Sequence, residues 1–248
     1  MNPKVTIVIA SYNSGKTIRC ALQSVKNQTY RDWECLVVDG ASNDDTIEIV
    51  KEFFATDSRF RFISEPDHGI YDAFNKGWKN ATGYWIYYLG SDDVIEKDGI
   101  ALLMSREDTN YAILAGYTRL VRLEGSTRIV KPGLPKFGIH QGMVMSREVM
   151  MVLGGFDEKY KIQADYDLMV RTINAGYKMK VIDAVVGNFI IGGTSQSLRS
   201  QWKYFLERYD IDKKYKLIKY PLLEAMSTVT RKVGSLIRSR IKLYIRKI

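Results

Sequence analysis

Two hydrophobic patterns alternate along the N-terminal half of the chain. Short runs of apolar residues, rich in β-branched and aromatic side chains, predict buried strands at 5–10, 33–38, 60–64 and 84–89. Between these runs, apolar residues three and four positions apart predict amphipathic helices. Because strands and helices alternate, we expect an α/β protein with a mostly parallel central sheet, right-handed crossovers and flanking helices.

The predicted helices of this half each have one apolar face. The face of the first helix is formed by Ile18, Ala21, Leu22 and Val25. The second helix is expected to pack through Ile47, Val50 and Phe54. The third helix is expected at 70–79, after a turn at 66–69.

The pattern changes after residue 93, where strands no longer alternate regularly with helices. Strands are expected at 112–122 and 127–130, as a hairpin, and at 142–145 and 179–186. Helices are expected at 96–104, at 147–153 with Ser146 as its cap, and at 164–175 with Gly176 ending it.

The C-terminal region has a pattern of its own. Within 226–248, apolar residues recur at helical spacing and seven lysines and arginines are interleaved with them. A basic amphipathic helix of this kind suits the surface of an anionic membrane, although it can also pack on a protein core with its basic face in solvent. We therefore expect one α/β domain at 1–195 and a basic, helical extension at 196–248.

Composition narrows the class of protein. A hydrophobic content of 46% in 248 residues supports a sizeable core. The net charge of +9 suits a phosphate-rich ligand or an anionic surface. Cys20 and Cys35 fall in predicted core elements, so buried, reduced thiols are expected rather than a disulfide framework or a zinc site. The sequence shows no signal-peptide pattern and no run of about 20 apolar residues, so a cytoplasmic location is expected.

Candidate chemistry lies where predicted strands end. Asp92 and Asp93 follow the aromatic strand, and Asp39 follows the strand at 33–38. Ligands of open α/β sheets gather beyond the carboxyl ends of the strands. Two adjacent carboxylates there suit a hard divalent cation that also binds phosphate oxygens. The alternative is a solvated turn that opens a helix.

A phosphate-binding P-loop is a competing interpretation of the first turn. Residues 10–17, Ala-Ser-Tyr-Asn-Ser-Gly-Lys-Thr, stand between a strand and a helix and resemble that motif. However, Ala10 replaces the first glycine, and its Cβ would hinder a close wrap around phosphate. A nucleotide phosphotransferase nevertheless remains an alternative function.

A set of motifs in a fixed order favours another class. These motifs are residues 6–13, 37–46, 89–93, 154–158 and 164–168. The set closely resembles the family 2 glycosyltransferases, over about residues 1–195. The segment 65–77, Glu-Pro-Asp-His-Gly-Ile-Tyr-Asp-Ala-Phe-Asn-Lys-Gly, resembles a bacterial subgroup that builds surface polysaccharides such as capsule, O-antigen and colanic acid. The resemblance implies a GT-A fold, Rossmann-like and mixed, a nucleotide-sugar donor, a divalent metal and inversion at the anomeric carbon.

The resemblance also implies roles at the donor site. Asp93 is expected to bind Mn²⁺ or Mg²⁺, with Asp92 near the ribose or the metal. Gly90 stands where many members carry another acidic residue, which leaves the number of protein ligands open. Asp39 is expected to accept a hydrogen bond from the base, which suits uracil and hence UDP.

Further donor contacts follow from the same motifs. The backbone of Ala10, Ser11 and Tyr12 is expected to line the base pocket. The side chains expected near the sugar or the phosphates are Asp67, Asp72, Asn75 and Lys76.

A reaction with inversion needs one base for the acceptor hydroxyl. Asp165 matches the catalytic position of the family, although Ala164 replaces the glutamate that often precedes it. Asp165 could also cap a helix, and Asp167 is the fallback for the base. His140 is either a phosphate or metal contact or a structural histidine. The loop 192–195 is either a cover for the donor or a linker.

We therefore predict a hexosyltransferase that moves a sugar from a nucleotide-sugar to a saccharide or lipid-linked acceptor in envelope polysaccharide biosynthesis. The basic segment 226–248 is expected to attach it peripherally to the inner face of the cytoplasmic membrane. A non-enzymatic membrane-binding module is a further alternative. No nucleic-acid partner is expected, because nothing resembles an aromatic-studded nucleic-acid fold.

Overall fold

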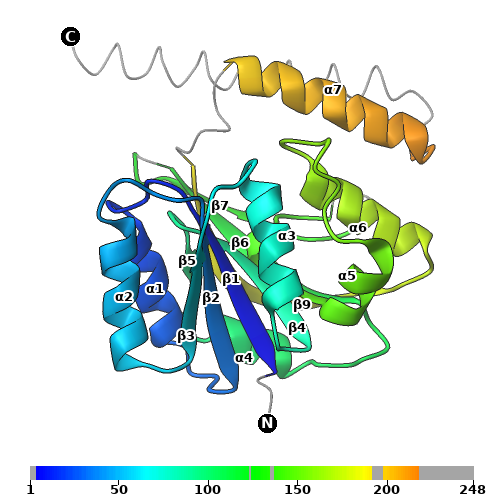
Figure 1. Cartoon of the computed structure of the whole chain (residues 1–248). Helices are drawn as coiled ribbons and strands as arrows, with labels where there is room; N and C mark the ends of the chain where they lie inside the picture. The colour runs from blue at the N-terminus through cyan, green and yellow to red at the C-terminus, as the bar shows by residue number, and fades with distance from the viewer. Residues whose placement is uncertain (1–3, 123, 135–136, 192–197, 218–248) are drawn as a thin grey trace. The chain divides into compact units, whose positions relative to one another are not determined.

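The chain forms two compact units, residues 1–191 and 192–248. The computed structural model describes residues 4–122, 124–134, 137–191 and 198–217 (Figure 1). The domain boundary expected at residue 195 and the basic segment 226–248 lie outside the described residues, so both stay predictions. No helix in the described parts is both long and apolar enough to cross a bilayer.

The first unit contains one mixed sheet. Its described strands are β1 (Val5–Ser11), β2 (Trp33–Asp39), β3 (Phe60–Ser64), β4 (Trp85–Gly90), β5 (Val94–Ile95), β6 (Ile113–Arg122), β7 (Thr127–Val130), β8 (Met143–Ser146) and β9 (Met179–Ile191). Their order is β3-β2-β1-β4-β8-β6-β9-β5, with β7 paired to β6. The strands β3, β2, β1 and β4 are parallel, as the alternating pattern predicted, and β8 runs antiparallel to β4 and β6.

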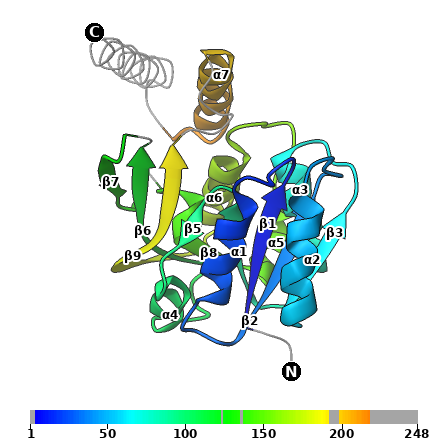
Figure 2. The same cartoon turned by 90° about the vertical axis from the view of Figure 1, so that its left-hand side faces the viewer.

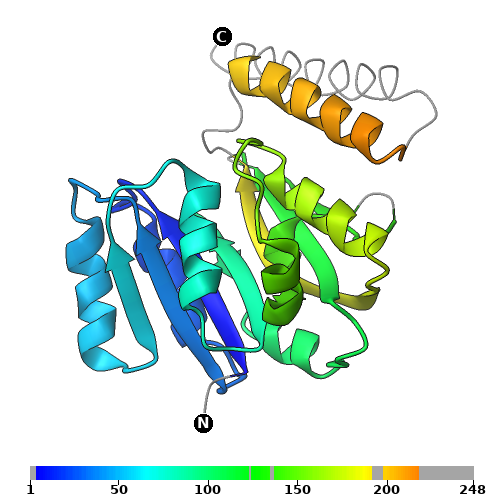
Figure 3. The ribbon, with the colours of Figure 1, turned by 45° about the vertical axis from the view of Figure 1, so that its right-hand side comes forward.

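Helices cover both faces of this sheet. The helices α1 (Ile18–Lys26) and α2 (Thr46–Thr56) lie on one face (Figure 2). The helices α3 (Ile70–Asn80), α5 (Arg147–Leu153) and α6 (Ala164–Asn174) lie on the other (Figure 3). The other helices in the described residues are α4 (Gly99–Met104), the short 3-10 turn η1 (His140–Gly142) and, in the second unit, α7 (Leu198–Lys214).

The period of two along the central strands divides the core. Alternate residues of β1 and β4, such as Ile7 and Tyr87, pack with α1, α2 and α4 in one large hydrophobic cluster. On the opposite face, the rings of Phe74, Tyr88 and Phe156 pack together, with centroids 4.6–5.6 Å apart. Both faces of the parallel strands are therefore buried, as their continuous apolar runs require.

Three local predictions differ from the structure. The helix α2 buries Ile49, Val50 and Phe53, whereas Phe54 is 52% exposed and packs its ring on Phe62 of the edge strand β3. The helix expected at 96–104 begins at Gly99, because β5 and the N–H of Glu96 first pair with β9. Of the two cysteines, Cys35 is buried but Cys20 is exposed.

Candidate active site

The carboxyl ends of three parallel strands meet at one edge of the sheet. The strand register places Ser11 beside Asp39 and Ala10 beside Gly90, so the end of β1 lies between those of β2 and β4. The chain turns to opposite sides of β1 at this point, and such a switch point is where open α/β sheets bind ligands. The predicted donor residues of all three strand ends are thus brought together.

Asp39 is fully buried at this edge, and its carboxylate accepts four hydrogen bonds. Its Oδ1 accepts from the hydroxyls of Ser11 and Ser42, and its Oδ2 accepts from the hydroxyl of Ser64 and the backbone N–H of Ser42, each at 2.9 Å. Three of the four donors are hydroxyls, which rotate to suit their partners. A hydroxyl donor that turns away would leave an oxygen of Asp39 for another donor.

Two backbone N–H groups of the turn that resembles a P-loop are already hydrogen-bonded. The N–H of Ser14 donates to Thr46 Oγ1 at 2.8 Å, and the N–H of Gly15 donates to Asp44 Oδ2 at 3.0 Å. A P-loop uses such groups to cradle phosphate. Here they join the loop after β1 to the loop after β2, so the geometry disfavours a P-loop phosphotransferase.

Tyr12, Gly40 and Asp67 form a wall next to Asp39. Tyr12 is 62% exposed, Asp67 is partly buried and Gly40 is buried. A Cβ placed on Gly40 would lie 3.3 Å from the ring of Tyr12 and 2.6 Å from Asp67 Oδ2. An exposed aromatic ring and a carboxylate therefore meet over a buried glycine.

The first turns of α3 present a linked set of charges near this wall. Asp72 accepts from the backbone N–H of His68 at 2.9 Å, and Lys76 Nζ lies 3.6 Å from the same carboxylate. Burial opposes ionisation of Asp72, but the hydrogen bond from His68 and the charge of Lys76 outweigh it and lower its pKa. Lys76 also donates to the carbonyl of Pro66 at 2.7 Å.

The amide of Asn75 is occupied at both ends by hydrogen bonds within the fold. It donates to the carbonyl of Phe156 and to Glu158, and it accepts from the N–H groups of Phe156 and Trp78. These bonds fasten α3 to the loop after α5. The position of Asn75 in its motif is thus explained by the fold.

Asp93 and Asp92 differ sharply in their surroundings. Asp93 is 1% exposed, and its oxygens accept from the N–H of Ile190 at 2.9 Å and from Gln141 Nε2 at 2.8 Å. Burial, aided by the charge of Asp92, raises the pKa of Asp93 to about 6. Asp92 is only partly buried, so it presents the more accessible oxygens.

The two carboxylates converge over Gly90. A Cβ at this position would lie 2.6 Å from Asp93 Oδ2 and 3.0 Å from Asp92 Oδ1. Two carboxylates this close together are costly to keep ionised, and their oxygens suit a hard divalent cation. Among the residues that the structure describes, no three acidic, histidine or cysteine side chains converge, so a cation here would complete its shell with phosphate or water oxygens.

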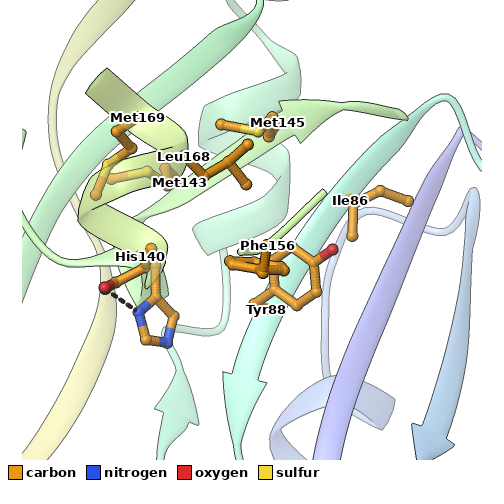
Figure 4. Close-up of a pocket in the computed structure, with 9 residues that line it drawn as sticks. Ile86, Tyr88, His140, Met143, Met145, Phe156, Leu168 and Met169 are labelled. Carbon is orange, nitrogen blue, oxygen red and sulfur yellow. Dashed lines mark hydrogen bonds and ion pairs between the residues drawn. The ribbon is translucent and has the colours of Figure 1, made fainter. Parts of the chain in front are cut away.

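Asp165 is the second residue of α6, in its first turn. It is not the N-cap residue, which is Gln163. Its Oδ2 lies 3.0 Å from His140 Nδ1 (Figure 4), and its Oδ1 accepts from Tyr71 Oη at 3.2 Å and from the N–H of Tyr166 at 2.8 Å. Burial raises the pKa of this carboxyl, but the hydrogen bond and charge of His140 outweigh it, so the net pKa is lowered. A helix N-terminus also favours the charged form.

Asp167 has different surroundings. It is fully buried and accepts from Arg171 Nε at 2.7 Å. Arg171 also donates to the carbonyls of Leu153 and Gly155. The pair thus fastens α6 to the end of α5, and the geometry favours Asp165 over Asp167 as a base.

A small, largely apolar cavity adjoins the pair of Asp165 and His140 (Figure 4). The side chains that line it with this pair are Ile86, Tyr88, Met143, Met145, Phe156, Leu168 and Met169. Apolar surroundings lower the local dielectric constant and strengthen a charge-assisted hydrogen bond. The polar partner of His140 in this structure is the candidate base, Asp165, rather than a predicted metal ligand.

Sequence reasoning missed several residues of the site. Tyr71, which binds Asp165, lies within the segment 65–77 but was given no role, and Gln141, which binds Asp93, lies outside the ordered motifs. Ser42 and Ser64 were given no role either, although both bind Asp39. Tyr71, Gln141 and Ser64 are distant from their partners in the chain, whereas Ser42 is only three residues from Asp39 and the motif 37–46 could have indicated its contact.

The family of the chain follows from a direct match. Residues 6–181 match the model of the family described as "Glycosyl transferase family 2", so the chain belongs to this family, as its ordered motifs predicted. The mixed α/β architecture is that of the GT-A glycosyltransferases in its structural neighbours.

Two solved structures illustrate this fold. The mannosyltransferase PcManGT from Pyrobaculum calidifontis, in complex with GDP-Man and Mn²⁺, has a TM-score of 0.70 at 18% identity and covers 92% of this chain and 70% of its own. S. aureus TarS 1–349, in complex with UDP-GlcNAc, has a TM-score of 0.69 at 17% identity and covers 93% and 71%.

Two curated relatives are 28% and 29% identical to this chain. A PGL/p-HBAD biosynthesis glycosyltransferase of Mycobacterium bovis (strain BCG / Pasteur 1173P2) is 29% identical over 83% of this chain and 84% of its own length. A chondroitin synthase of Pasteurella multocida (strain Pm70) is 28% identical over 80% of this chain. The chain spans only 22% of that synthase and similarly small parts of the next two relatives.

Proposed function

We propose that the chain is an inverting glycosyltransferase that transfers a sugar from UDP-sugar to a hydroxyl of a saccharide or lipid-linked acceptor. The observation that carries the proposal is the presence of two carboxylate sites whose pKa values are shifted in opposite directions. Asp93, beside Asp92, has a raised pKa and suits a cation, whereas Asp165 has a lowered pKa and stays ionised. Diphosphate departure needs the first kind of site, and hydroxyl deprotonation needs the second.

The donor would bind along the strand ends. Asp39, next to the wall of Tyr12, Gly40 and Asp67, supplies the acceptor for a uracil N–H. Lys76, on the first turns of α3, supplies a positive charge for phosphate. TarS was solved with UDP-GlcNAc and PcManGT with GDP-Man, so relatives of this fold bind either nucleotide. The carboxylate of Asp39 is the feature of this chain that leads us to UDP.

Mn²⁺ or Mg²⁺ would be held by Asp92 and Asp93 over Gly90. Asp92 is partly buried and offers the more accessible oxygens, and the buried Asp93 offers Oδ2, which faces Gly90 beside Asp92. The ion supplies stabilisation of the negative charge that grows on the diphosphate. Asp93 thus remains a metal ligand, as the sequence predicts, and Asp92 is added as the second.

Asp165 would take the proton of the acceptor hydroxyl. Its carboxylate is held by His140, Tyr71 and the N–H of Tyr166, which fix its orientation. A positioned, ionised carboxylate on the face opposite the leaving diphosphate gives a single displacement and hence inversion.

Two relatives point toward the biological setting. One is named a PGL/p-HBAD biosynthesis glycosyltransferase and another a chondroitin synthase. With the basic segment 226–248, they support a role in envelope polysaccharide assembly at the inner face of the cytoplasmic membrane. This placement rests on the sequence of that segment.

A screen of nucleotide-sugars for protection against thermal unfolding tests the proposal. With Mn²⁺ present, a UDP-sugar at 100 times its dissociation constant should add about 2.7 kcal/mol of stability. ATP and GDP-sugars should add much less. Protection by GDP-sugars alone would contradict the assignment of uracil to Asp39, and protection by none would contradict the donor class.

A further inference from the structure

The single turn η1 sends two neighbouring side chains to the two carboxylate sites of the proposed reaction. His140 Nδ1 lies 3.0 Å from Asp165 Oδ2. The next residue, Gln141, donates from Nε2 to Asp93 Oδ2 at 2.8 Å. One short element therefore contacts both the candidate base and the buried carboxylate of the cation site.

The side chain of Gln141 makes one hydrogen bond that the structure describes, to Asp93. It is 3% exposed, and its Oε1 is buried with no partner among the described residues. A buried amide with an unpaired oxygen costs stability compared with an apolar side chain of the same shape. The hydrogen bond to Asp93 is the one interaction of this amide that the structure records, which is unexpected if the residue serves packing alone.

His140 is oriented in a comparable way. Its ring packs edge-on against Phe74, with centroids 5.8 Å apart, and its Nε2 is buried with no described partner. Nδ1 is thus the nitrogen that makes a polar contact, and an Nδ1–H directed at Asp165 fixes the rotamer of that carboxylate.

The turn itself is firmly anchored to the sheet. The hydroxyl of Tyr87 donates to the carbonyl of Gln141. A Cβ on Gly142 would lie 2.3 Å from Thr118 Oγ1 and 3.0 Å from the carbonyl of Gly116, so the backbone of η1 is pressed against β6. Because interiors are close-packed, such an element holds its side chains in place.

We propose that η1 is a two-armed positioning element, in which Gln141 orients Asp93 for the cation and His140 orients Asp165 for the acceptor. This inference rests on the proposed function. Neither side chain is assigned a direct contact with substrate. Partners that orient a metal-binding carboxylate from behind influence affinity strongly, since they fix where its oxygens point. Substitution of Gln141 should therefore lower cation affinity, whereas substitution of His140 should lower turnover.

The Gln141 arm is tested by calorimetry of UDP binding with MnCl₂. Gln141→Leu should weaken Mn²⁺-dependent binding by about 10–100-fold. The matched control is Gln28→Leu, because Gln28 is also a buried glutamine, whose side-chain amide, among the described residues, bonds with Ser24, Glu96 and Ile100 in and around α1 and α4. The control should lower the melting temperature and leave Mn²⁺ affinity unchanged. Equal Mn²⁺ affinity in both variants and the wild type would overturn this arm.

The His140 arm is tested by a pair of substitutions and by NMR. His140→Phe keeps a ring but removes the hydrogen-bond donor. With the UDP-sugar that protects best in the screen as donor, the rate of UDP release should fall at least tenfold. The affinity for UDP with Mn²⁺ should stay unchanged. His140→Asn places an N–H near the position of Nδ1 and should restore much of the rate. Equal rates in the two variants would reduce His140 to a packing residue and overturn this arm.

The histidine signals give a readout that needs no substrate. The chain has two histidines, and His68 Nδ1 also lies near a carboxylate, 3.3 Å from Asp72 Oδ2, so the His140 signals are identified by their absence from His140→Phe. Nitrogen chemical shifts at pH 8 should show the Nδ1–H tautomer for His140. An Nε2–H tautomer at His140 would contradict the contact. If the wild type itself shows no Mn²⁺-dependent UDP binding, the proposed function fails first, which separates that failure from a failure of η1.

Discussion

Asp93 combines deep burial with a neighbouring negative charge, so its ionised form is costly without a cation. Its pKa is about 6 in the folded chain, against 3.8 for an ordinary aspartate. Between these values the folded protein binds more protons than the unfolded chain, so stability falls as pH rises through this window. Above pH 6 the full cost, on the order of 3 kcal/mol, is present.

Asp93→Asn should therefore stabilise the metal-free protein above pH 6. The new amide can accept from the N–H of Ile190, and it can donate to Gln141 once that amide turns its unpaired oxygen. In EDTA at pH 8 we expect a gain of about 2–3 kcal/mol, and at pH 3 almost none. Thermal unfolding at both pH values measures it. A variant that is less stable than the wild type at pH 8 would contradict the burial cost assigned to Asp93.

Asp165→Asn should lower turnover with little effect on UDP binding. Asparagine keeps the size of the side chain but cannot take a proton, so transfer should fall by about 10²–10⁴-fold, mainly in kcat. A transfer assay beside UDP calorimetry measures both quantities. A variant with near wild-type transfer would place the base elsewhere.

Asp167→Asn is the companion substitution two residues along the same helix. It weakens the buried pair with Arg171, so stability should drop by about 1–3 kcal/mol while kcat stays close to that of the wild type. A stable but inactive Asp167→Asn would transfer the role of base to Asp167.

At the scale of elements, periodicity predicted the strands and most helices, because buried faces impose a period of 2 or 3.6 on the sequence. The bounds of β1, β2 and β3 agree with prediction within a residue. The predicted packing face of α2 was wrong. The buried residues Thr46, Ile49, Val50 and Phe53 recur at the same helical spacing as the predicted set of Ile47, Val50 and Phe54. Two apolar faces were available, and only packing on the sheet decides between them.

The site was predictable to the extent that it lies at strand ends. The motifs placed Asp39, Asp92 and Asp93 at one edge, and the structure brings these three strand ends together. The contacts of η1 were not predictable, since a turn of three residues has no hydrophobic period. Its partners lie 25 and 48 positions away in the chain.

The close approach of α3 to β1 gives a prediction for an element. A Cβ on Gly77 would lie 2.3 Å from Val8 Cγ1, so Gly77→Ala should push α3 from the sheet. We expect a loss of about 1–3 kcal/mol of stability, and weaker UDP binding because Lys76 moves with the helix. Gly133→Ala is the control, since its Cβ would meet nothing within 4 Å. Denaturant unfolding measures both, and an unchanged midpoint for Gly77→Ala would contradict this packing.

At the scale of the whole molecule, the first unit carries the candidate chemistry and the basic segment 226–248 carries the predicted membrane attachment. Truncation after Pro221 should leave UDP binding intact and abolish binding to vesicles that contain anionic lipid. High salt should weaken attachment of the full chain, because surface charges are screened within about 10 Å at 0.1 M. Co-sedimentation measures this, with zwitterionic vesicles as the control. Equal binding of the full and truncated chains would exclude the segment as the anchor.

Titration of UDP into the wild-type protein, once with Mn²⁺ and once with EDTA, asks whether the donor site at the strand ends is built around a cation. We expect saturable binding with Mn²⁺ that weakens at least tenfold in EDTA, because Asp92 and Asp93 repel the diphosphate unless a cation lies between them. UDP binding of equal affinity in Mn²⁺ and EDTA would contradict a donor site of this kind.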